Sequence, residues 1–135
     1  MGMLNLEIIT PERVLVHEEV DMVEANGALG EFGILPGHIQ FLTMLEIGEV
    51  RYMKGGKTIY IATSGGFAEV IEDKVTFLVD TAEFAGEVDV ERAKKALERA
   101  ESTLKGLPSD HSEYKIHEMA LFRAIARISV ASKGL

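Results

Sequence analysis

Short runs of alternating apolar and polar residues fill about the first 80 positions of the chain. Leu4-Asn5-Leu6-Glu7-Ile8 has the period of two that is typical of a half-buried strand. Similar runs occupy residues 20–25, 48–53, 57–62, 66–71 and 74–79, and Gly55-Gly56 has the composition of a tight hairpin turn. Many short strands at roughly 8 to 12 residue spacing indicate an antiparallel β-sandwich or barrel.

The hydrophobic period changes after Gly86. Asp89 stands where its carboxylate can cap the free N–H groups of a helix, and Gly106 and Pro108 provide the end of that helix. Between them, apolar residues recur at steps of three and four, which predicts one amphipathic helix. These residues are Val90, Ala93, Ala96, Leu97, Ala100 and Leu104.

A second helix is predicted after Asp110, which with Glu113 resembles a capping box. Its predicted apolar face consists of His117, Leu121, Ala124, Ile128 and Ala131. Alanine buries little area, so we expect only weak pairing of the two helices, and we hypothesise that the pair can detach on a hinge at residues 85–87. The predicted fold class is α+β, with an antiparallel β-sandwich or barrel over residues 1–84 and an antiparallel two-helix hairpin over residues 85–135.

Charge divides the chain at the same place. The net charge is −8, made up of −9 over residues 1–84 and +1 over residues 85–135. An acidic body argues against a nucleic-acid partner. Past Glu118 the charged side chains are Arg123, Arg127 and Lys133. Such a basic end suits either an acidic partner surface or the dipole of a helix C-terminus, and both interpretations stay open.

No catalytic or metal site is predicted. The four histidines lie far apart or on different predicted faces, and none forms an HxH or HExxH pair. Gly56-Lys57-Thr58 precedes a strand where a phosphate-binding loop needs a helix, and Ser64 lacks the flanking residues of a nucleophile elbow. The chain also lacks cysteine, a signal-peptide pattern and an apolar run long enough to span a bilayer, so we expect a cytoplasmic location.

The segment from Gly30 to His38, Gly-Glu-Phe-Gly-Ile-Leu-Pro-Gly-His, demands one specific backbone path because it contains three glycines and a proline. It is either a buried corner of the sandwich or an exposed docking loop. The segment closely resembles the hallmark of the epsilon subunit of bacterial F-type ATP synthases. Residues 10–13, 64–70 and 80–83 resemble that family too, in the same order and over essentially the whole chain.

This resemblance implies a ten-stranded sandwich followed by two helices, in a non-catalytic subunit of the rotating central stalk. Such a subunit binds the gamma subunit, sits on the c-ring, and couples catalysis to proton or sodium transport. It inhibits ATP hydrolysis when its helices extend toward the alpha and beta subunits. The family location is peripheral, on the cytoplasmic face of the inner membrane. Glu31 and His38 would face gamma and the c-ring, and Arg123 and Arg127 would meet acidic beta-subunit surface.

The resemblance also implies a regulatory ligand, ATP, and no required cofactor. Residues 88–93 are similar to the Ile/Leu-Asp-x-x-Arg-Ala signature of ATP-binding members, through Val88, Asp89, Arg92 and Ala93. Residues at the family's helper positions are Glu83, Arg123 and Arg127. Two alternatives stay open: Asp89 only caps a helix while the arginines form surface ion pairs, or the chain is a free-standing nucleotide-sensing adaptor of the same architecture.

Overall fold

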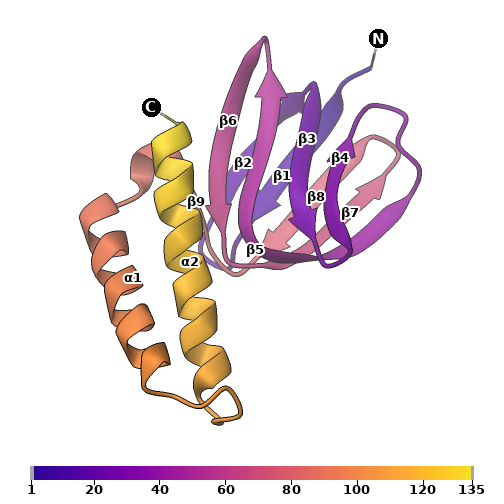
Figure 1. Ribbon diagram of the computed structural model, residues 1–135. Helices are drawn as coiled ribbons and strands as arrows, with labels where there is room; N and C mark the ends of the chain where they lie inside the picture. Colours follow the sequence, from indigo (N-terminus) through magenta and orange to yellow (C-terminus); the bar gives the residue numbers. More distant parts are fainter. Residues whose placement is uncertain (1, 135) are drawn as a thin grey trace.

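The computed structural model describes residues 2–134, which form a strand-rich body followed by two helices (Figure 1). The described part contains nine strands: β1 (Leu4–Ile9), β2 (Val14–Val20), β3 (Met22–Gly27), β4 (Gly30–Ile34), β5 (Phe41–Lys54), β6 (Lys57–Thr63), β7 (Gly66–Ile71), β8 (Lys74–Val79) and β9 (Ala82–Phe84). A 3₁₀ turn, η1 (Ala85–Glu87), leads to the helices α1 (Val90–Lys105) and α2 (Tyr114–Lys133).

Strand β5 belongs to both layers of the body. Residues 41–45 pair with β7, whereas residues 48–54 pair with β6, and β3 runs beside the second half. One layer is therefore β2-β1-β8-β7-β5 and the other is β4-β3-β5-β6-β9. The family resemblance implies about ten strands. The nine strands fit this number because β5 serves twice.

The apolar core lies between these layers. Residues along β1 alternate buried and more exposed, as their sequence pattern predicts, and Leu4, Leu6 and Ile8 are completely buried. The largest completely buried side chain of the body is Phe77 on β8. Burial of alternate residues on both inner faces makes the body a sandwich.

The pairing is antiparallel except between β1 and β8, which run parallel. Parallel neighbours need a long connection, and the chain between β1 and β8 supplies one. The predicted turn at Gly55-Gly56 is confirmed. Both glycines have positive φ, 58° and 80°, in the two-residue turn between β5 and β6.

The strand pattern predicts two features incorrectly. Residues 20–25 are not one strand, because the chain turns at Asp21, whose carboxylate accepts a hydrogen bond from the Gly55 N–H at 3.1 Å. The glycine-rich segment is neither wholly corner nor wholly loop. Residues 30–34 form β4, paired with β3, and a turn from Leu35 to His38 follows, closed by the His38 N–H on the Leu35 carbonyl.

Helix α1 begins as the sequence predicts. The Asp89 carboxylate accepts the Arg92 backbone N–H at 3.1 Å, and Gly106 is the C-cap. The predicted cap of α2 is wrong. The turn from Pro108 continues past Asp110, so α2 begins only at Tyr114, and its N-cap Glu113 makes no side-chain cap.

Helix α2 lies between α1 and the body, where it packs on β5 and β6 (Figure 1). The predicted face of α2 includes the buried Ala124 and Ala131. A second set of buried residues, Ala126 and Val130, lies outside that stripe. This second set has no separate sequence signal, because alanine and valine also suit a solvent-facing position.

Candidate functional site

A cleft of about 550 Å³ lies where the helical pair meets the β body. The body contributes the turn before β2, the end of β6 and the segment from Asp80 to Glu83. The helices contribute Arg92 from α1 and both Arg123 and Arg127 from α2. Four of the residues that the sequence assigns to nucleotide binding therefore line one cleft. This size is within the range of small-molecule sites, roughly 300 to 1,000 Å³.

Three alanines keep this cleft open between the helices: Ala96, Ala120 and Ala124. Arg123 and Arg127 lie one turn apart on α2, so both side chains reach the same cleft. A longer apolar residue at the alanine positions would fill the space between the arginines. The alanine-rich stripe therefore leaves room for a ligand as well as joining the helices.

Two of the cleft arginines are available to a ligand. Arg127 is paired with Glu83 through its Nε, and both side chains are only about a quarter exposed, at 28% and 25%. Within residues 2–134, no ion pair joins Arg92 or Arg123 to a carboxylate. Planar guanidinium groups match the oxygens of a phosphate, so these two can bind an anionic ligand without first breaking a pair.

The other three predicted nucleotide-binding residues do not line the cleft. Val88 is the half-buried C-cap of η1, and Asp89 caps α1. Ala93 is completely buried and accepts no bulkier side chain without displacing its neighbours. These three residues shape the start of α1, and through it the position of Arg92. The helix-cap alternative for Asp89 is confirmed as a contact, and it is compatible with such a role.

Sequence reasoning missed an ion pair beside the cleft, between Arg13 and Glu87. Nη1 and Nη2 of Arg13 each lie 2.9 Å from a different Glu87 oxygen, and Nη2 also donates to the Ala82 carbonyl at 3.2 Å. The hydrogen bond from Arg13, together with one from the Phe84 backbone N–H, holds the pKa of Glu87 below its ordinary value. Arg13 and Glu87 are 74 positions apart, and a single sequence contains no pattern that predicts a contact at this separation.

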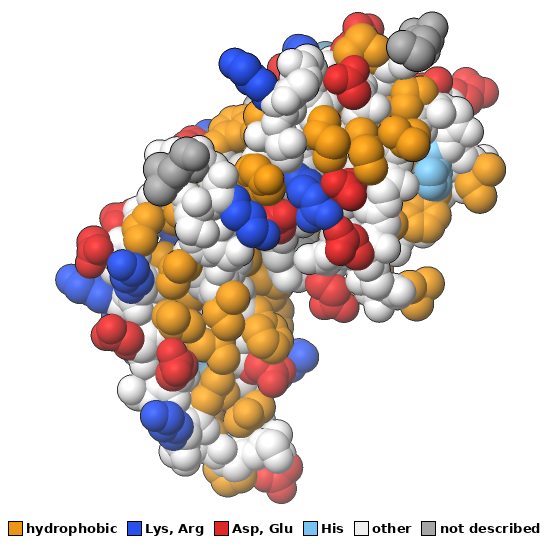
Figure 2. Space-filling view, turned by 45° about the horizontal axis from the view of Figure 1, so that its top comes forward, with side chains coloured by type: hydrophobic (Ala, Val, Ile, Leu, Met, Phe, Trp, Pro, Cys, Tyr) orange, Lys and Arg blue, Asp and Glu red, His pale blue; other side chains and the backbone are white. Residues whose placement is uncertain are grey.

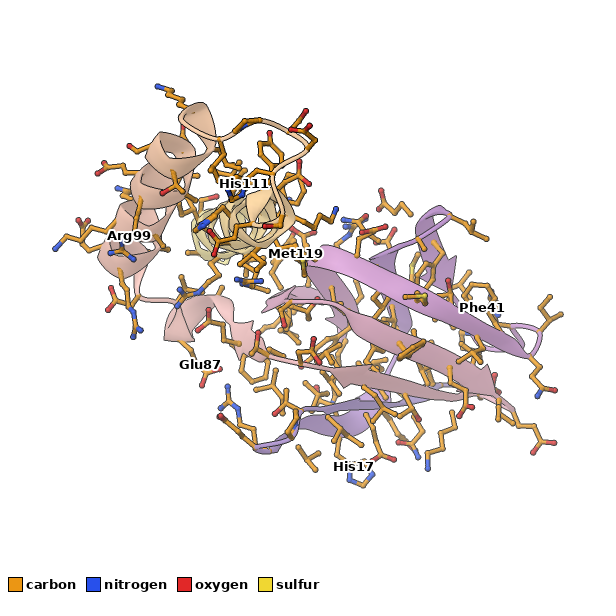
Figure 3. The ribbon with its side chains drawn as sticks, turned by 90° about the horizontal axis from the view of Figure 1, so that it is seen from below. His17, Phe41, Glu87, Arg99, His111 and Met119 are labelled. Carbon is orange, nitrogen blue, oxygen red and sulfur yellow. The ribbon has the colours of Figure 1, made fainter. Side chains whose placement is uncertain are left out.

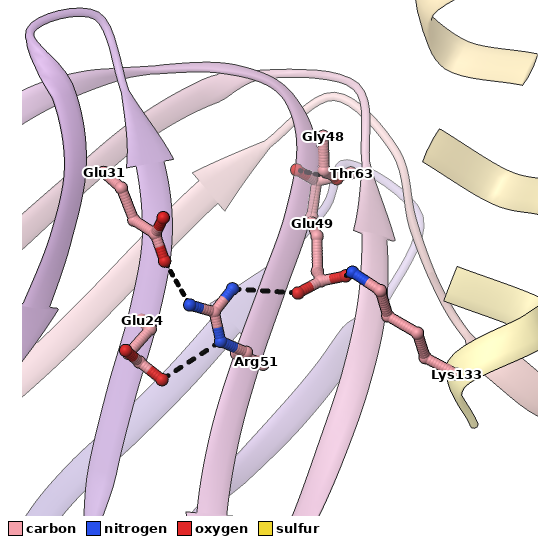
Figure 4. Close-up of polar contacts among 7 residues, drawn as sticks. All are labelled: Glu24, Glu31, Gly48, Glu49, Arg51, Thr63 and Lys133. Carbon is pink, nitrogen blue, oxygen red and sulfur yellow. Dashed lines mark hydrogen bonds and ion pairs between the residues drawn. The ribbon is translucent and has the colours of Figure 1, made fainter. Parts of the chain in front are cut away.

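A second polar contact joins α2 to β5 (Figure 4). Lys133 Nζ lies 2.7 Å from Glu49 Oε1, and Arg51 Nη1 lies 2.9 Å from the other oxygen of Glu49. Arg51 also pairs with Glu24 at 3.0 Å and with Glu31. Glu49 is only 10% exposed, so two cations hold an almost buried carboxylate. Figure 2 shows acidic and basic side chains gathered where the helices meet the body.

The two predicted partner-binding residues lie on different elements. Glu31 is on β4, and its half-exposed side chain faces Arg51. His38 follows the turn after β4, where its Nδ1 lies 2.8 Å from the Ile39 carbonyl and its ring packs edge-on against Phe41. No hydrogen bond or ion pair joins Glu31 to His38 in the described chain.

Residues 2–134 contain neither a cluster of metal ligands nor a membrane-spanning helix. No group of three or more histidine and acidic side chains is placed to hold a metal ion. Neither α1 nor α2 combines the length and the apolar composition that a membrane crossing requires.

Comparisons with known proteins cover nearly the whole chain. The model described as "ATP synthase, Delta/Epsilon chain, beta-sandwich domain" matches residues 3–85, and "ATP synthase, Delta/Epsilon chain, long alpha-helix domain" matches residues 87–132. The curated ATP synthase epsilon chains of Geobacter metallireducens and Geobacter sulfurreducens are 53% and 51% identical over 131 residues, with 97% of this chain and 95% of each relative covered.

Solved structures extend this likeness. A chain in the cryo-EM structure of the Euglena gracilis mitochondrial ATP synthase, OSCP/F1/c-ring, matches with a TM-score of 0.83 at 26% identity, over 96% of this chain and 81% of that one. A chain of the Tetrahymena thermophila central stalk and c-ring shares the fold, with a TM-score of 0.63 at 12% identity and coverage of 96% and 94%. The family models and the relatives at about half identity agree: the chain belongs to the ATP synthase epsilon-chain family.

Proposed function

We propose that this protein is a non-catalytic central-stalk subunit of an F-type ATP synthase, and that ATP binding in the cleft regulates its helical pair. Family membership supports the stalk role. The observation that carries the regulatory part is the meeting of Glu83, Arg92, Arg123 and Arg127 in one cleft between the β body and both helices. A ligand held there bridges three parts of the chain.

The charges of the cleft favour an anion at its helical side. Arg92 and Arg123 supply the phosphate contacts, and Arg127 joins them or keeps its pair with Glu83. ATP that bridges α1, α2 and the body stabilises the docked hairpin, because a ligand shifts a population toward the state that it binds better. Bound ATP thereby opposes extension of the helices toward the catalytic subunits.

Calorimetric titration of the isolated chain with ATP tests the binding. We expect heat that saturates for the unmodified protein, and an affinity at least about tenfold lower for Arg92→Ala, because a charge-assisted contact contributes roughly 1.5–3 kcal/mol. Arg99→Ala is the matched control. Arg99 is also on α1 but points to solvent away from the cleft, and its loss should leave the affinity unchanged (Figure 3). No binding heat at millimolar ATP would refute the ATP part of the proposal.

The inhibitory role is tested on the assembled enzyme. We expect ATP hydrolysis by the reconstituted complex to increase several-fold when residues 88–135 are deleted, because the element that reaches the catalytic subunits is then absent. The deletion begins after η1, so the sandwich keeps its nine described strands. Equal hydrolysis with and without the helices, in complexes of equal subunit content, would exclude inhibition by this segment.

The partner assignments complete the proposal. Gamma and the c-ring contact the body through Glu31 and His38, and the alpha and beta subunits contact the extended helices. The complex places the protein peripherally on the cytoplasmic face of the inner membrane. A free-standing nucleotide-sensing adaptor of the same architecture would not co-purify with gamma, so co-purification separates the two functions.

A further inference from the structure

An arginine of the β body, Arg13, binds the connection between the body and the helices. η1 spans residues 85–87, between β9 and the start of α1, and its last residue is Glu87 (Figure 3). Arg13 reaches Glu87 from the turn between β1 and β2, with both of its terminal nitrogens at 2.9 Å from the carboxylate. Two parallel hydrogen bonds fix the orientation of the carboxylate as well as its position.

The same carboxylate also closes the connection on itself. Glu87 Oε1 accepts the Phe84 backbone N–H at 2.9 Å, and the Val88 N–H donates to the Ala85 carbonyl at 3.3 Å. Rotation of the backbone within residues 85–87 would carry Glu87 away from both Phe84 and Arg13. The connection therefore cannot change direction without loss of these contacts.

The turn that carries Arg13 is itself rigid. The Thr10 hydroxyl oxygen accepts the N–H groups of Glu12 and Arg13 at 3.2 and 3.1 Å, and the Thr10 N–H donates to the Arg13 carbonyl at 2.9 Å. The guanidinium is tied in addition to β9 through the Ala82 carbonyl. Arg13 is thus fixed to the β1–β2 turn and to β9, and it contacts the connection to the helices through Glu87.

The packing around this connection is uneven, because Ala85 is half-buried against α2 whereas Gly86 is exposed. A Cβ placed on Gly86 would meet nothing within 4 Å, so the residue in the middle of η1 lies in open space. Ala85 packs against the C-terminal end of α2, so the polar contacts around Glu87 hold the connection together with this packing. Half-exposed partners, at 45% and 39%, can exchange this pair for water without a large barrier.

We propose that the Arg13–Glu87 pair is a lock on the hinge at residues 85–87, and that the helical pair leaves the body only when this lock is open. The proposal rests on the movable hairpin of the proposed function. It adds a control point on the body side, separate from the pairs Glu83–Arg127 and Glu49–Lys133, which hold α2 directly. Loss of the Arg13–Glu87 pair alone makes residues 85–87 more mobile. Release of the helices from the body requires the α2 contacts to break as well.

Distances between two spin labels test this lock on the full chain without nucleotide. The chain contains no cysteine, so Lys57→Cys on β6 and Ser109→Cys between the helices, both exposed, provide the labelling sites. In Arg13→Gln and in Glu87→Gln we expect the fraction of long, undocked distances to increase about two- to fivefold, the shift that loss of a surface ion pair of good geometry produces.

Two further variants decide between a lock and a general loss of charge. Lys115→Gln removes the Lys115–Glu118 pair within α2, 3.3 Å long, and should leave the distances unchanged. The double variant Arg13→Gln/Glu87→Gln should undock no more than either single variant, because both changes break one interaction. Unchanged distances in the single variants, or additive effects in the double variant, would overturn the proposal. ATP is absent throughout, so failure here is distinct from failure of ATP binding.

Discussion

Replacement of Gly66 by alanine is expected to abolish folding of the β body, or to lower its free energy of unfolding by about 4 kcal/mol or more. Gly66 begins β7 with a φ of +149°, and an added Cβ would lie 2.0 Å from the Leu78 carbonyl oxygen and 2.8 Å from the Val79 Cα. Both of these atoms belong to the backbone of the paired strand β8, which cannot move aside without breaking the ladder. Urea unfolding, followed by circular dichroism, measures the loss.

Gly30→Ala separates the clash from the backbone strain. Gly30 also has a positive φ, +121°, but a Cβ there would meet nothing within 4 Å. We expect only the cost of the unfavourable backbone conformation, about 1–3 kcal/mol. Similar losses for the two variants would mean that the contact with β8 is not the cause.

Replacement of Phe77 by alanine is expected to lower the free energy of unfolding by about 3–5 kcal/mol. Phe77 is completely buried between the two layers, so its removal leaves a cavity that the paired strands on either side cannot close. The measurement is again the urea midpoint, with the slope unchanged.

The neighbouring residue provides the control for this change. Leu78→Ala removes an apolar side chain from the same strand at a position that is 53% exposed. Its loss should cost less than about 1 kcal/mol, since exposed substitutions rarely cost more. A Phe77→Ala variant as stable as Leu78→Ala would show that the sandwich core is not where the structure puts it.

Local patterns predict much of this fold. The period of two identifies β1, β7 and β8, where buried residues alternate with more exposed ones. In β6 the last three residues are all buried, because α2 packs on this strand. The period of three and four identifies both helices. The start of α2 could not be predicted, because Asp110 has the chemistry of a cap but lies in a turn that extends to Glu113. The strand β4 could not be predicted, because its glycines have a low strand preference and its pairing with β3 is a tertiary effect.

The candidate site, too, could be predicted from the sequence only in part. Glu83, Arg92, Arg123 and Arg127 could be named beforehand because the chain resembles a family in which those positions act together, and the cleft brings these four together. Arg13 and Glu87 could not, although their pair lies beside the cleft. Single surface charges are common, and only the approach of distant segments decides which of them meet.

The shared strand β5 has a mechanical consequence. It contains 14 residues, a contour of about 45 Å at roughly 3.3 Å per residue, and is bonded to β7, β3 and β6 along its length. Its residue Glu49 holds Lys133 of α2. A pull on α2 along β5 loads many ladder bonds in shear at the same time, instead of peeling them one by one. In a stalk that turns under load, we therefore expect the side-chain contacts of α2 to break before the strands of the sandwich separate.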